Sequence, residues 1–325
     1  MEKYTKSLET LSKFVGNTPT IHVFCEIDGE TVDIFAKYEA WNYSGSIKDR
    51  MALQILISAY HTSRLKEKDV IVEATSGNTG IAFAAMGAFL GHPVEIYMPD
   101  WLSDERKHIL RFYGAKLFEI SAADGGFLKC IELAEEKGNK NSYFCPKQFE
   151  NSHNPASHFT ATAPELHKSL INGGFGEPTI FVAGAGTGGT IMGVYRYFSQ
   201  INEEFKAFPV FPSNNTDGSH RIEGIGDSFV PKILSLKELG KVIRVNDDDA
   251  IIMARQLNKM GLSVGISSGA NLFAAINHAH ASPNNEIVTT VFADGNNKYL
   301  STDLCSSSKE TASRDIKVID YEFIA

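Results

Sequence analysis

Residues 69–90, DVIVEATSGNTGIAFAAMGAFL, read as a strand, a loop and a helix in direct succession. Residues 69–74 are a short apolar run typical of a buried strand, and residues 81–90 predict a largely apolar helix that Gly91 ends. The loop between them, TSGNTG at 75–80, carries hydroxyl groups directly ahead of the helix. A strand that passes straight into a covering helix is the building unit of a parallel α/β sheet.

The same alternation of strands and helices continues on both sides of this stretch. It predicts two α/β domains with parallel sheets and a cleft between them: a smaller domain at 41–153, and a larger one made of 1–40 and 154–325. Residues 1–20 are a polar start, and Asp28-Gly29 predicts a hairpin turn. A polar tail begins at about residue 306 and ends in a strand-like segment at 316–324. We expect this segment to pair with a neighbour or a sheet edge. The expected strands are 21–25, 32–37, 69–74, 93–98, 116–120, 142–145, 179–183, 206–211, 241–245 and 286–293, and the later helices are 127–136, 155–170, 190–199, 249–260 and 271–279.

The composition is that of an ordinary globular protein, with 325 residues, of which 43% are hydrophobic and 22% charged. The formal net charge is −8 and the pI about 5.7. An acidic surface repels nucleic acid and anionic lipid, so we expect neither as a partner. The start, MEKYTK, lacks the apolar core of a signal peptide, and no apolar run reaches membrane-spanning length. We therefore expect a cytoplasmic protein.

The cysteines and histidines do not form a metal-ligand pattern. The four cysteines, at positions 25, 130, 145 and 305, lie far apart without a C-x-x-C pair, so we expect reduced thiols. The histidines at 153, 158 and 167 form only a loose group, and we expect them to be surface or capping residues. No metal is expected.

Three loops carry the polar groups that a binding site needs, since ligands of open parallel sheets bind outside the carboxyl ends of the strands. They are TSGNTG at 75–80, GAGTGGT at 184–190 and GISSGA at 265–270. The N–H groups and hydroxyls of the first two form cradles suited to a carboxylate or a phosphate. Each loop alone is equally well explained as an ordinary strand-to-helix turn, but two such cradles in one chain favour an anionic ligand.

Lys48 lies in SGSIKDR at 44–50, a polar turn directly ahead of an apolar helix. The positive end of a helix dipole disfavours an added proton on an amine placed there. A partly deprotonated amine is what Schiff-base chemistry needs. A solvated lysine is the ordinary alternative, and the two anion cradles elsewhere in the chain favour the functional one.

A dinucleotide site is a competing interpretation of residues 184–189, which match G-x-G-x-x-G between a strand and a helix. A nicotinamide dehydrogenase would carry an acidic residue at the end of the following strand to hold the ribose. Strand 206–211 runs instead into PSNN at 212–215, and Glu203 and Glu204 come too early. An NAD-dependent dehydrogenase is therefore the remote alternative.

Taken together, the motifs resemble the fold-type II pyridoxal-phosphate enzymes, specifically cysteine synthase and the catalytic core of cystathionine β-synthase. The resemblance covers about residues 10–305. It implies a tryptophan synthase β-like fold, a homodimer, a mobile smaller domain, an active site in the interdomain cleft, pyridoxal 5′-phosphate as cofactor and a small amino-acid substrate. The motifs are GNTP at 16–19, SGSIKDR at 44–50, TSGNTG at 75–80, KQFENSHNP at 147–155, GAGTGGT at 184–190, HRIEGIG at 220–226, GISSGA at 265–270 and YLST at 299–302.

By this resemblance, Lys48 binds the cofactor covalently and later removes the α-proton of the substrate. Asn78 bonds the 3′-oxygen of the cofactor, and Ser267 faces its pyridine nitrogen. A neutral hydroxyl at that nitrogen favours loss of a β-substituent. The cup for the cofactor phosphate is formed by Gly186, Thr187, Gly188, Gly189 and Thr190. The substrate carboxylate is held by Thr75, Ser76, Asn78, Thr79 and Gln148.

The implied reaction is β-replacement on L-cysteine or an activated L-serine through an aminoacrylate, to which a nucleophile adds. Three branches compete: cysteine synthesis from O-acetylserine and sulfide, cystathionine synthesis with homocysteine, and cysteine breakdown with release of sulfide. A catalytically silent ligand-binding relative is the alternative outside this class.

Asp227 is the difference from the cysteine synthase pattern that matters most for the reaction. It follows the glycines of HRIEGIG, where cysteine synthases usually carry a small apolar residue on a loop that lines the cleft. A carboxylate there can activate water as a general base and would repel an incoming hydrosulfide anion. We therefore hypothesise a sulfide-releasing lyase that converts L-cysteine and water to L-serine and hydrogen sulfide, with Asp227 as a catalytic residue. A solvated loop aspartate is the alternative.

Overall fold

The computed structural model describes residues 2–214, 220–226, 229–282, 286–306 and 310–324. The chain divides into two compact units. The first unit comprises Met1–Gly16 and Asn42–Asn154, and the second comprises Asn17–Trp41 and Pro155–Ala325.

The first unit is built on a four-stranded parallel sheet with the strand order β5-β4-β3-β6. Ile71 of β3 is paired with Val94 of β4 on one side and with Phe144 of β6 on the other. Successive side chains of a strand point to opposite faces, so Ile71 and Val72 pack into different clusters of the hydrophobic core. The strands are β3 (Val70–Ala74), β4 (Val94–Pro99), β5 (Lys116–Ile120) and β6 (Tyr143–Phe144).

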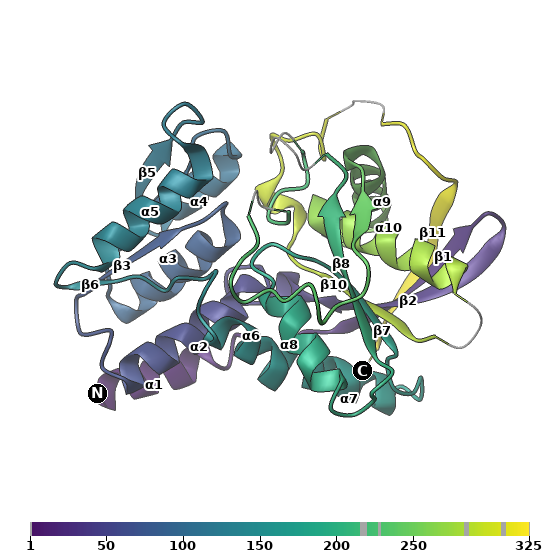
Figure 1. Cartoon of the computed structure of the whole chain (residues 1–325), viewed down its shortest axis with the longest axis horizontal. Helices are drawn as coiled ribbons and strands as arrows, with labels where there is room; N and C mark the ends of the chain where they lie inside the picture. Colours follow the sequence, from purple (N-terminus) through teal and green to yellow (C-terminus); the bar gives the residue numbers. More distant parts are fainter. Residues whose placement is uncertain (1, 215–219, 227–228, 283–285, 307–309, 325) are drawn as a thin grey trace. The chain divides into compact units, whose positions relative to one another are not determined.

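Helices cover both faces of this sheet (Figure 1). α2 (Lys48–His61) and α3 (Asn78–Leu90) contribute apolar side chains to the cluster that contains Ile71. α5 (Gly126–Gly138) packs instead against Val72 on the other face, and α4 (Asp104–Phe112) precedes β5.

The polar start of the chain forms a helix that its residue pattern does not predict. α1 (Glu2–Leu11) lies against α2, where the rings of Tyr4 and Tyr60 stack with their centroids 4.6 Å apart. Leu8 and Leu11 enter the same core cluster as α2 and α3. α1 is therefore an integral part of the first unit.

The second unit is built on a seven-stranded sheet with the order β11-β1-β2-β10-β7-β8-β9. β1 (Thr20–Ile27) pairs antiparallel with β2 (Glu30–Tyr38) and with β11 (Ile316–Ile324), which confirms both the predicted hairpin and the edge pairing of the tail. Asp28 and Gly29 in the hairpin turn have φ values of 53° and 84°. From β2 onward the strands are parallel, namely β10 (Val288–Phe292), β7 (Ile180–Gly184), β8 (Lys206–Pro212) and β9 (Ile243–Val245).

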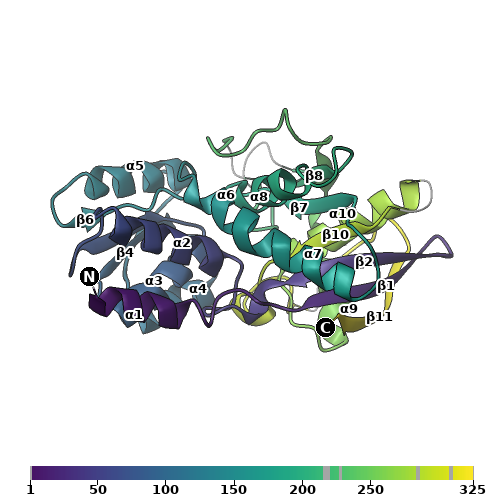
Figure 2. The same cartoon turned by 90° about the horizontal axis from the view of Figure 1, so that it is seen from below.

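Two pairs of helices cover this sheet. α9 (Asp247–Lys259) and α10 (Ile266–Ala281) share a core cluster with Ile180 and Val182 of β7. α7 (Ala163–Asn172) and α8 (Gly189–Phe198) lie on the opposite face (Figure 2). The remaining short elements are α6 (His153–Ser157), the π-helical turn η2 (His158–Thr162), and the 3₁₀ turns η1 (Glu39–Trp41) and η3 (Asn296–Lys298).

Among the residues that the structure describes, no helix is long and apolar enough to cross a bilayer. The same residues contain no group of three or more His, Cys, Asp or Glu side chains arranged to hold a metal ion. All four cysteines are free thiols, and only Cys305 is exposed.

Candidate active site

The predicted phosphate cup lies at the carboxyl end of β7 and the start of α8. β7 ends at Gly184, α8 begins at Gly189, and Gly188 adopts a left-handed conformation with φ of 84°. The hydroxyl of Thr187 accepts the N–H of Gly189 at 3.3 Å. The first N–H groups of a helix have no partner within the helix, so together with the helix dipole they attract an anion. This arrangement suits a phosphate group.

A second segment, HRIEGIG at 220–226, packs directly on the cup. The N–H of Gly226 donates to the carbonyl oxygen of Ala185 at 3.0 Å. A Cβ atom at position 186 would lie 2.2 Å from the carbonyl oxygen of Gly224. Position 186 therefore requires glycine, because any side chain would push this segment away from the cup.

His158 supports the cup through the start of α8. Its Nε2 lies 3.3 Å from the hydroxyl of Thr190, and its Nδ1 lies 2.9 Å from the hydroxyl of Thr162. His158 is only 2% exposed. The expectation that it is a surface or capping residue is wrong, because the π-helical turn places it against α8, where Gly193 leaves room for it.

Ser267 lies at the same edge of the sheet as the cup. It belongs to the first turn of α10, whose N-cap residue Gly265 donates its N–H to the carbonyl oxygen of Asp294 at 3.1 Å. Asp294 follows β10, and β10 pairs in parallel with β7. The carboxyl ends of both strands therefore bring the start of α10 beside the cup, where the two ends of one cofactor can be held.

Asn271 connects these two parts, and no motif pointed to it. Its Oδ1 accepts the N–H of Gly184 at 2.7 Å, and its Nδ2 donates to the carbonyl oxygen of Val291 at 2.8 Å. The side chain is 2% exposed. One buried amide on α10 thus joins the last residue of β7, directly ahead of the cup, to the neighbouring strand β10.

We expect Asn271→Ala to weaken cofactor binding to the apoenzyme by roughly tenfold or more. The change leaves two backbone groups without their side-chain partner, a partly buried N–H and a buried carbonyl oxygen, and an unsatisfied buried group costs about 1–3 kcal/mol. Titration with pyridoxal 5′-phosphate measures the loss. The control is Asn277→Ala on the same helix, where the amide bonds Phe273 and Arg314 instead. Equal losses in both variants would contradict the role of Asn271.

In the first unit, a carboxylate fixes the turn that carries Lys48. Asp49 accepts the N–H of Ser44 at 2.8 Å and its hydroxyl at 2.7 Å, and Asp49 is fully buried. The N–H of Lys48 lies 3.3 Å from the hydroxyl oxygen of Ser46. These bonds place Lys48 at the first residue of α2, as the sequence predicts.

The predicted carboxylate loop, residues 75–80, follows β3, and its last three residues already belong to α3, which begins at Asn78. The hydroxyl oxygen of Thr75 accepts the N–H groups of Gly77 at 2.9 Å and of Gly80 at 3.4 Å. Gly77 has a φ of 141°, a conformation that glycine adopts readily and other residues rarely do. The loop is therefore preformed, and its backbone N–H groups lie at a helix start.

Thr79 and Gln148 form a buried pair beneath this loop. The hydroxyl of Thr79 donates to Oε1 of Gln148 at 2.6 Å, and Nε2 of Gln148 donates to the carbonyl oxygen of Ala74 at 2.7 Å. A primary amide has a second N–H, so Gln148 keeps one donor for a ligand. Since the hydroxyl proton of Thr79 is used on Gln148, Thr79 orients that amide in this structure.

We expect Thr79→Ala to weaken binding of L-cysteine while the enzyme retains its cofactor. Because Thr79 orients the Gln148 amide, its truncation weakens the hydrogen bond from Gln148 to the substrate carboxylate, and complete loss of such a bond to a charged group costs about 1.5–3 kcal/mol. Spectral titration of the cofactor-loaded enzyme measures substrate affinity, and Thr79→Ser, which keeps the hydroxyl, is the control. An unchanged affinity in Thr79→Ala would show that the carboxylate binds elsewhere.

Glu73 is a buried acid directly behind this pair, and sequence reasoning did not single it out. Its carboxyl group accepts the N–H groups of Ala74 at 2.9 Å and of Gln148 at 3.2 Å. Burial raises the pKa of the Glu73 carboxyl from 4.5 to about 8, and these two N–H groups offset only part of the rise. Glu73 therefore holds the backbone of Gln148 mainly as a neutral acid at pH 7.

We expect Glu73→Gln to flatten the pH dependence of stability. The unfolded carboxyl ionises near pH 4.5 and the folded one near pH 8, so its contribution to stability is complete below the lower value. It is lost as pH rises through the folded pKa, by up to about 1.4 kcal/mol per pH unit. Urea unfolding at several pH values measures the slope, with the exposed Glu132→Gln as control. Parallel slopes in wild type and Glu73→Gln would contradict this assignment.

The predicted site residues are thus divided between the two units. The second unit holds the cup and Ser267, and the first holds Lys48, residues 75–79 and Gln148. Residues 184–190 contain no acidic side chain, which suits a phosphate dianion. Asp227 lies outside the described residues. The individual roles, the domain limits and the location of the site in a cleft stay predictions.

Comparison with known proteins identifies the class. Residues 11–294 match the family described as pyridoxal-phosphate dependent enzyme, so the chain belongs to this family. Cysteine synthase B of Campylobacter jejuni is 41% identical over 303 residues, covering 91% of this chain and 98% of the relative.

Two solved structures of a hydrogen sulfide-producing enzyme from Fusobacterium nucleatum are also similar. The first is 42% identical with a TM-score of 0.91. The second, an aspartate-to-asparagine variant in complex with an α-aminoacrylate intermediate, is 43% identical with a TM-score of 0.93. Each match covers 97% of this chain and 98% of the other.

The chain is therefore a pyridoxal-phosphate-dependent enzyme of the cysteine synthase family, and its reaction class is β-replacement. The predicted fold type and cofactor are confirmed. The family match removes the dehydrogenase alternative, because G-x-G-x-x-G at 184–189 belongs to a member of the pyridoxal-phosphate family rather than to a dinucleotide-binding protein.

Proposed function

We propose that this enzyme releases sulfide from L-cysteine, converting L-cysteine and water to L-serine and hydrogen sulfide. The bond between the β-carbon and sulfur breaks, a bond from the β-carbon to the oxygen of water forms, and the sulfur leaves with a proton. The observation that carries the proposal is the similarity over 97% of the chain to a hydrogen sulfide-producing enzyme.

The residues of this chain divide the work. Lys48 takes the α-proton of the substrate, and the preformed loop at 75–79 with the free N–H of Gln148 orients the substrate carboxylate. The cofactor, when bound, supplies the electron sink for loss of the β-substituent. Ser267 offers its pyridine nitrogen a hydroxyl rather than a carboxylate, which favours elimination over a long-lived carbanion.

Asp227 is the residue that we propose for the water step. Its preceding residue, Gly226, donates its N–H to Ala185 beside the cup. Water adds slowly to a β-carbon unless a base removes its proton, and general-base catalysis typically contributes about 10²–10⁴-fold. The aspartate-to-asparagine variant of the similar enzyme was obtained with an aminoacrylate intermediate, which is the behaviour that this role predicts for Asp227→Asn.

We expect Asp227→Asn to form aminoacrylate from L-cysteine while its production of L-serine falls by about 10²-fold or more. Absorbance spectroscopy follows the aminoacrylate, and chromatography with a sulfide assay follows the products. Asp320→Asn, which changes an exposed carboxylate on β11 of the same unit, is the control and should match wild type. Wild-type serine production by Asp227→Asn would leave Asp227 as a solvated loop residue.

Cysteine synthesis is the second candidate, because the curated relative at 41% identity is a cysteine synthase. The two activities are compared by supplying L-cysteine alone, or O-acetylserine with sulfide, to the same preparation. A higher kcat/KM for O-acetylserine with sulfide would make cysteine synthesis the better assignment. Sulfide release with formation of serine supports the lyase.

A further inference from the structure

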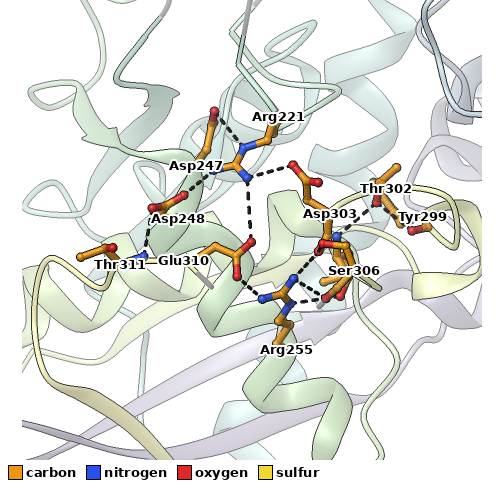
Figure 3. Close-up of polar contacts among 11 residues, drawn as sticks. Arg221, Asp247, Asp248, Arg255, Tyr299, Thr302, Asp303, Ser306, Glu310 and Thr311 are labelled. Atoms are coloured by element: carbon orange, nitrogen blue, oxygen red, sulfur yellow. Dashed lines mark hydrogen bonds and ion pairs between the residues drawn. The ribbon is translucent and has the colours of Figure 1, made fainter. Parts of the chain in front are cut away.

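Arg221 joins separate segments of the second unit through its guanidinium group (Figure 3). It lies between β8 and β9 and forms ion pairs with Asp247 and Asp248 at the start of α9, the first with a distance of 3.5 Å from Nε to Oδ2. Its Nη1 lies 2.9 Å from Oδ2 of Asp303 and 3.9 Å from Oε1 of Glu310. Both of these acidic residues belong to the chain after β10.

Arg255 of α9 holds that late part of the chain independently (Figure 3). Its Nε donates to the carbonyl oxygen of Leu304 at 3.2 Å, and its Nη2 donates to that of Ser306 at 2.9 Å. Its Nη1 pairs with Glu310, whose side chain is only 2% exposed. Arg221 therefore attaches residues 220–226 to residues 303–306 and 310, which Arg255 already holds against α9.

That attached segment, residues 220–226, is the one that lies on the phosphate cup. Gly226 bonds Ala185, and the carbonyl oxygen of Gly224 occupies the position of a side chain at residue 186. No side chain separates the two backbones at this point. Any displacement of the segment is therefore transmitted directly to the backbone of the cup.

The segment that contains Asp303 also contacts the start of α10, through Tyr299 and Asp294. The hydroxyl of Tyr299 donates to Oδ2 of Asp294 at 2.9 Å, and the carbonyl oxygen of Asp294 accepts the N–H of Gly265. Gly265 precedes the turn that carries Ser267. The ion pair between Arg221 and Asp303 therefore connects residues 220–226, which lie on the cup, to residues 294–303, which bond the turn ahead of Ser267.

We propose that Arg221 is a positioning residue for the cofactor phosphate. Its ion pair with Asp303 holds residues 220–226 over the cup. Arg221 does not act on the phosphate itself but through the backbone of Gly224 and Gly226. The proposal concerns cofactor binding and is independent of which substrate the enzyme uses.

The test compares binding of pyridoxal 5′-phosphate and of pyridoxal, which lacks the phosphate, to the apoenzyme. Arg221→Met keeps much of the apolar stem and removes the charge, so it should weaken pyridoxal 5′-phosphate binding roughly tenfold and leave pyridoxal binding about unchanged. Asp303→Asn should reproduce this pattern from the other side of the ion pair. Arg221→Lys should show a smaller loss, because a point charge cannot bond several carboxylates as the guanidinium fork does.

Arg314→Met is the matched control. The side chain of Arg314 is 35% exposed, like that of Arg221, and it pairs with Asp28 and Asn277 away from the cup. It should leave both affinities at wild-type values. Unchanged pyridoxal 5′-phosphate affinity in Arg221→Met and Asp303→Asn would overturn the proposal, as would equal losses for both ligands. If Arg221→Met does not fold, Asp303→Asn and Arg221→Lys decide the outcome by the same criteria.

Discussion

At Gly186 two backbone segments of the second unit come into direct contact. The carbonyl oxygen of Gly224 lies where a side chain at 186 would begin, so the cup is formed by backbone atoms packed on backbone atoms. Residues 184–190 contain no cationic side chain. An anion at the cup would therefore be bound by the first N–H groups of α8. A site of this kind is precise only when the segments that form it are fixed from behind. Asn271, His158 and the ion pairs of Arg221 hold these segments in place.

The fold was largely predictable because its signal is local. Buried parallel strands read as short apolar runs, and covering helices are bounded by glycine and polar caps, as residues 69–91 show. α1 was missed because its buried positions, among them Leu8 and Leu11, are few in a polar sequence, and their partner is α2. The segment 155–170 reads as one helix, yet a π-helical turn at His158–Thr162 interrupts it. That interruption is set by packing against α8, which the local sequence does not encode.

The candidate site was predictable only where motifs carry it. Glycines and hydroxyls at strand ends mark loops that bind anions, and the structure places those loops at helix starts as expected. Glu73, Asn271 and His158 carry no such signal, since their importance comes from burial and from partners distant in the sequence. Asn271, for example, bonds Gly184 from 87 positions away. A buried polar side chain with two backbone partners can be identified only when its neighbours in space are known.

The C-terminal segment is an integral part of the second unit rather than an appendage. β11 pairs with β1 from Thr20 to Ile27 and so covers an edge strand that would otherwise expose its N–H and C=O groups. Gln256 of α9 bonds the backbone of β11 through both ends of its amide, at 2.9 Å to Ile316 and 2.7 Å to Val318. The same helix holds residues 303–306 through Arg255. Arg221 forms ion pairs with the first turn of α9. This one helix therefore contacts β11, residues 303–306 and residues 220–226. Contacts that extend to β11 therefore hold the segments around the predicted phosphate cup, although each of the cofactor loops predicted from sequence lies well before β11.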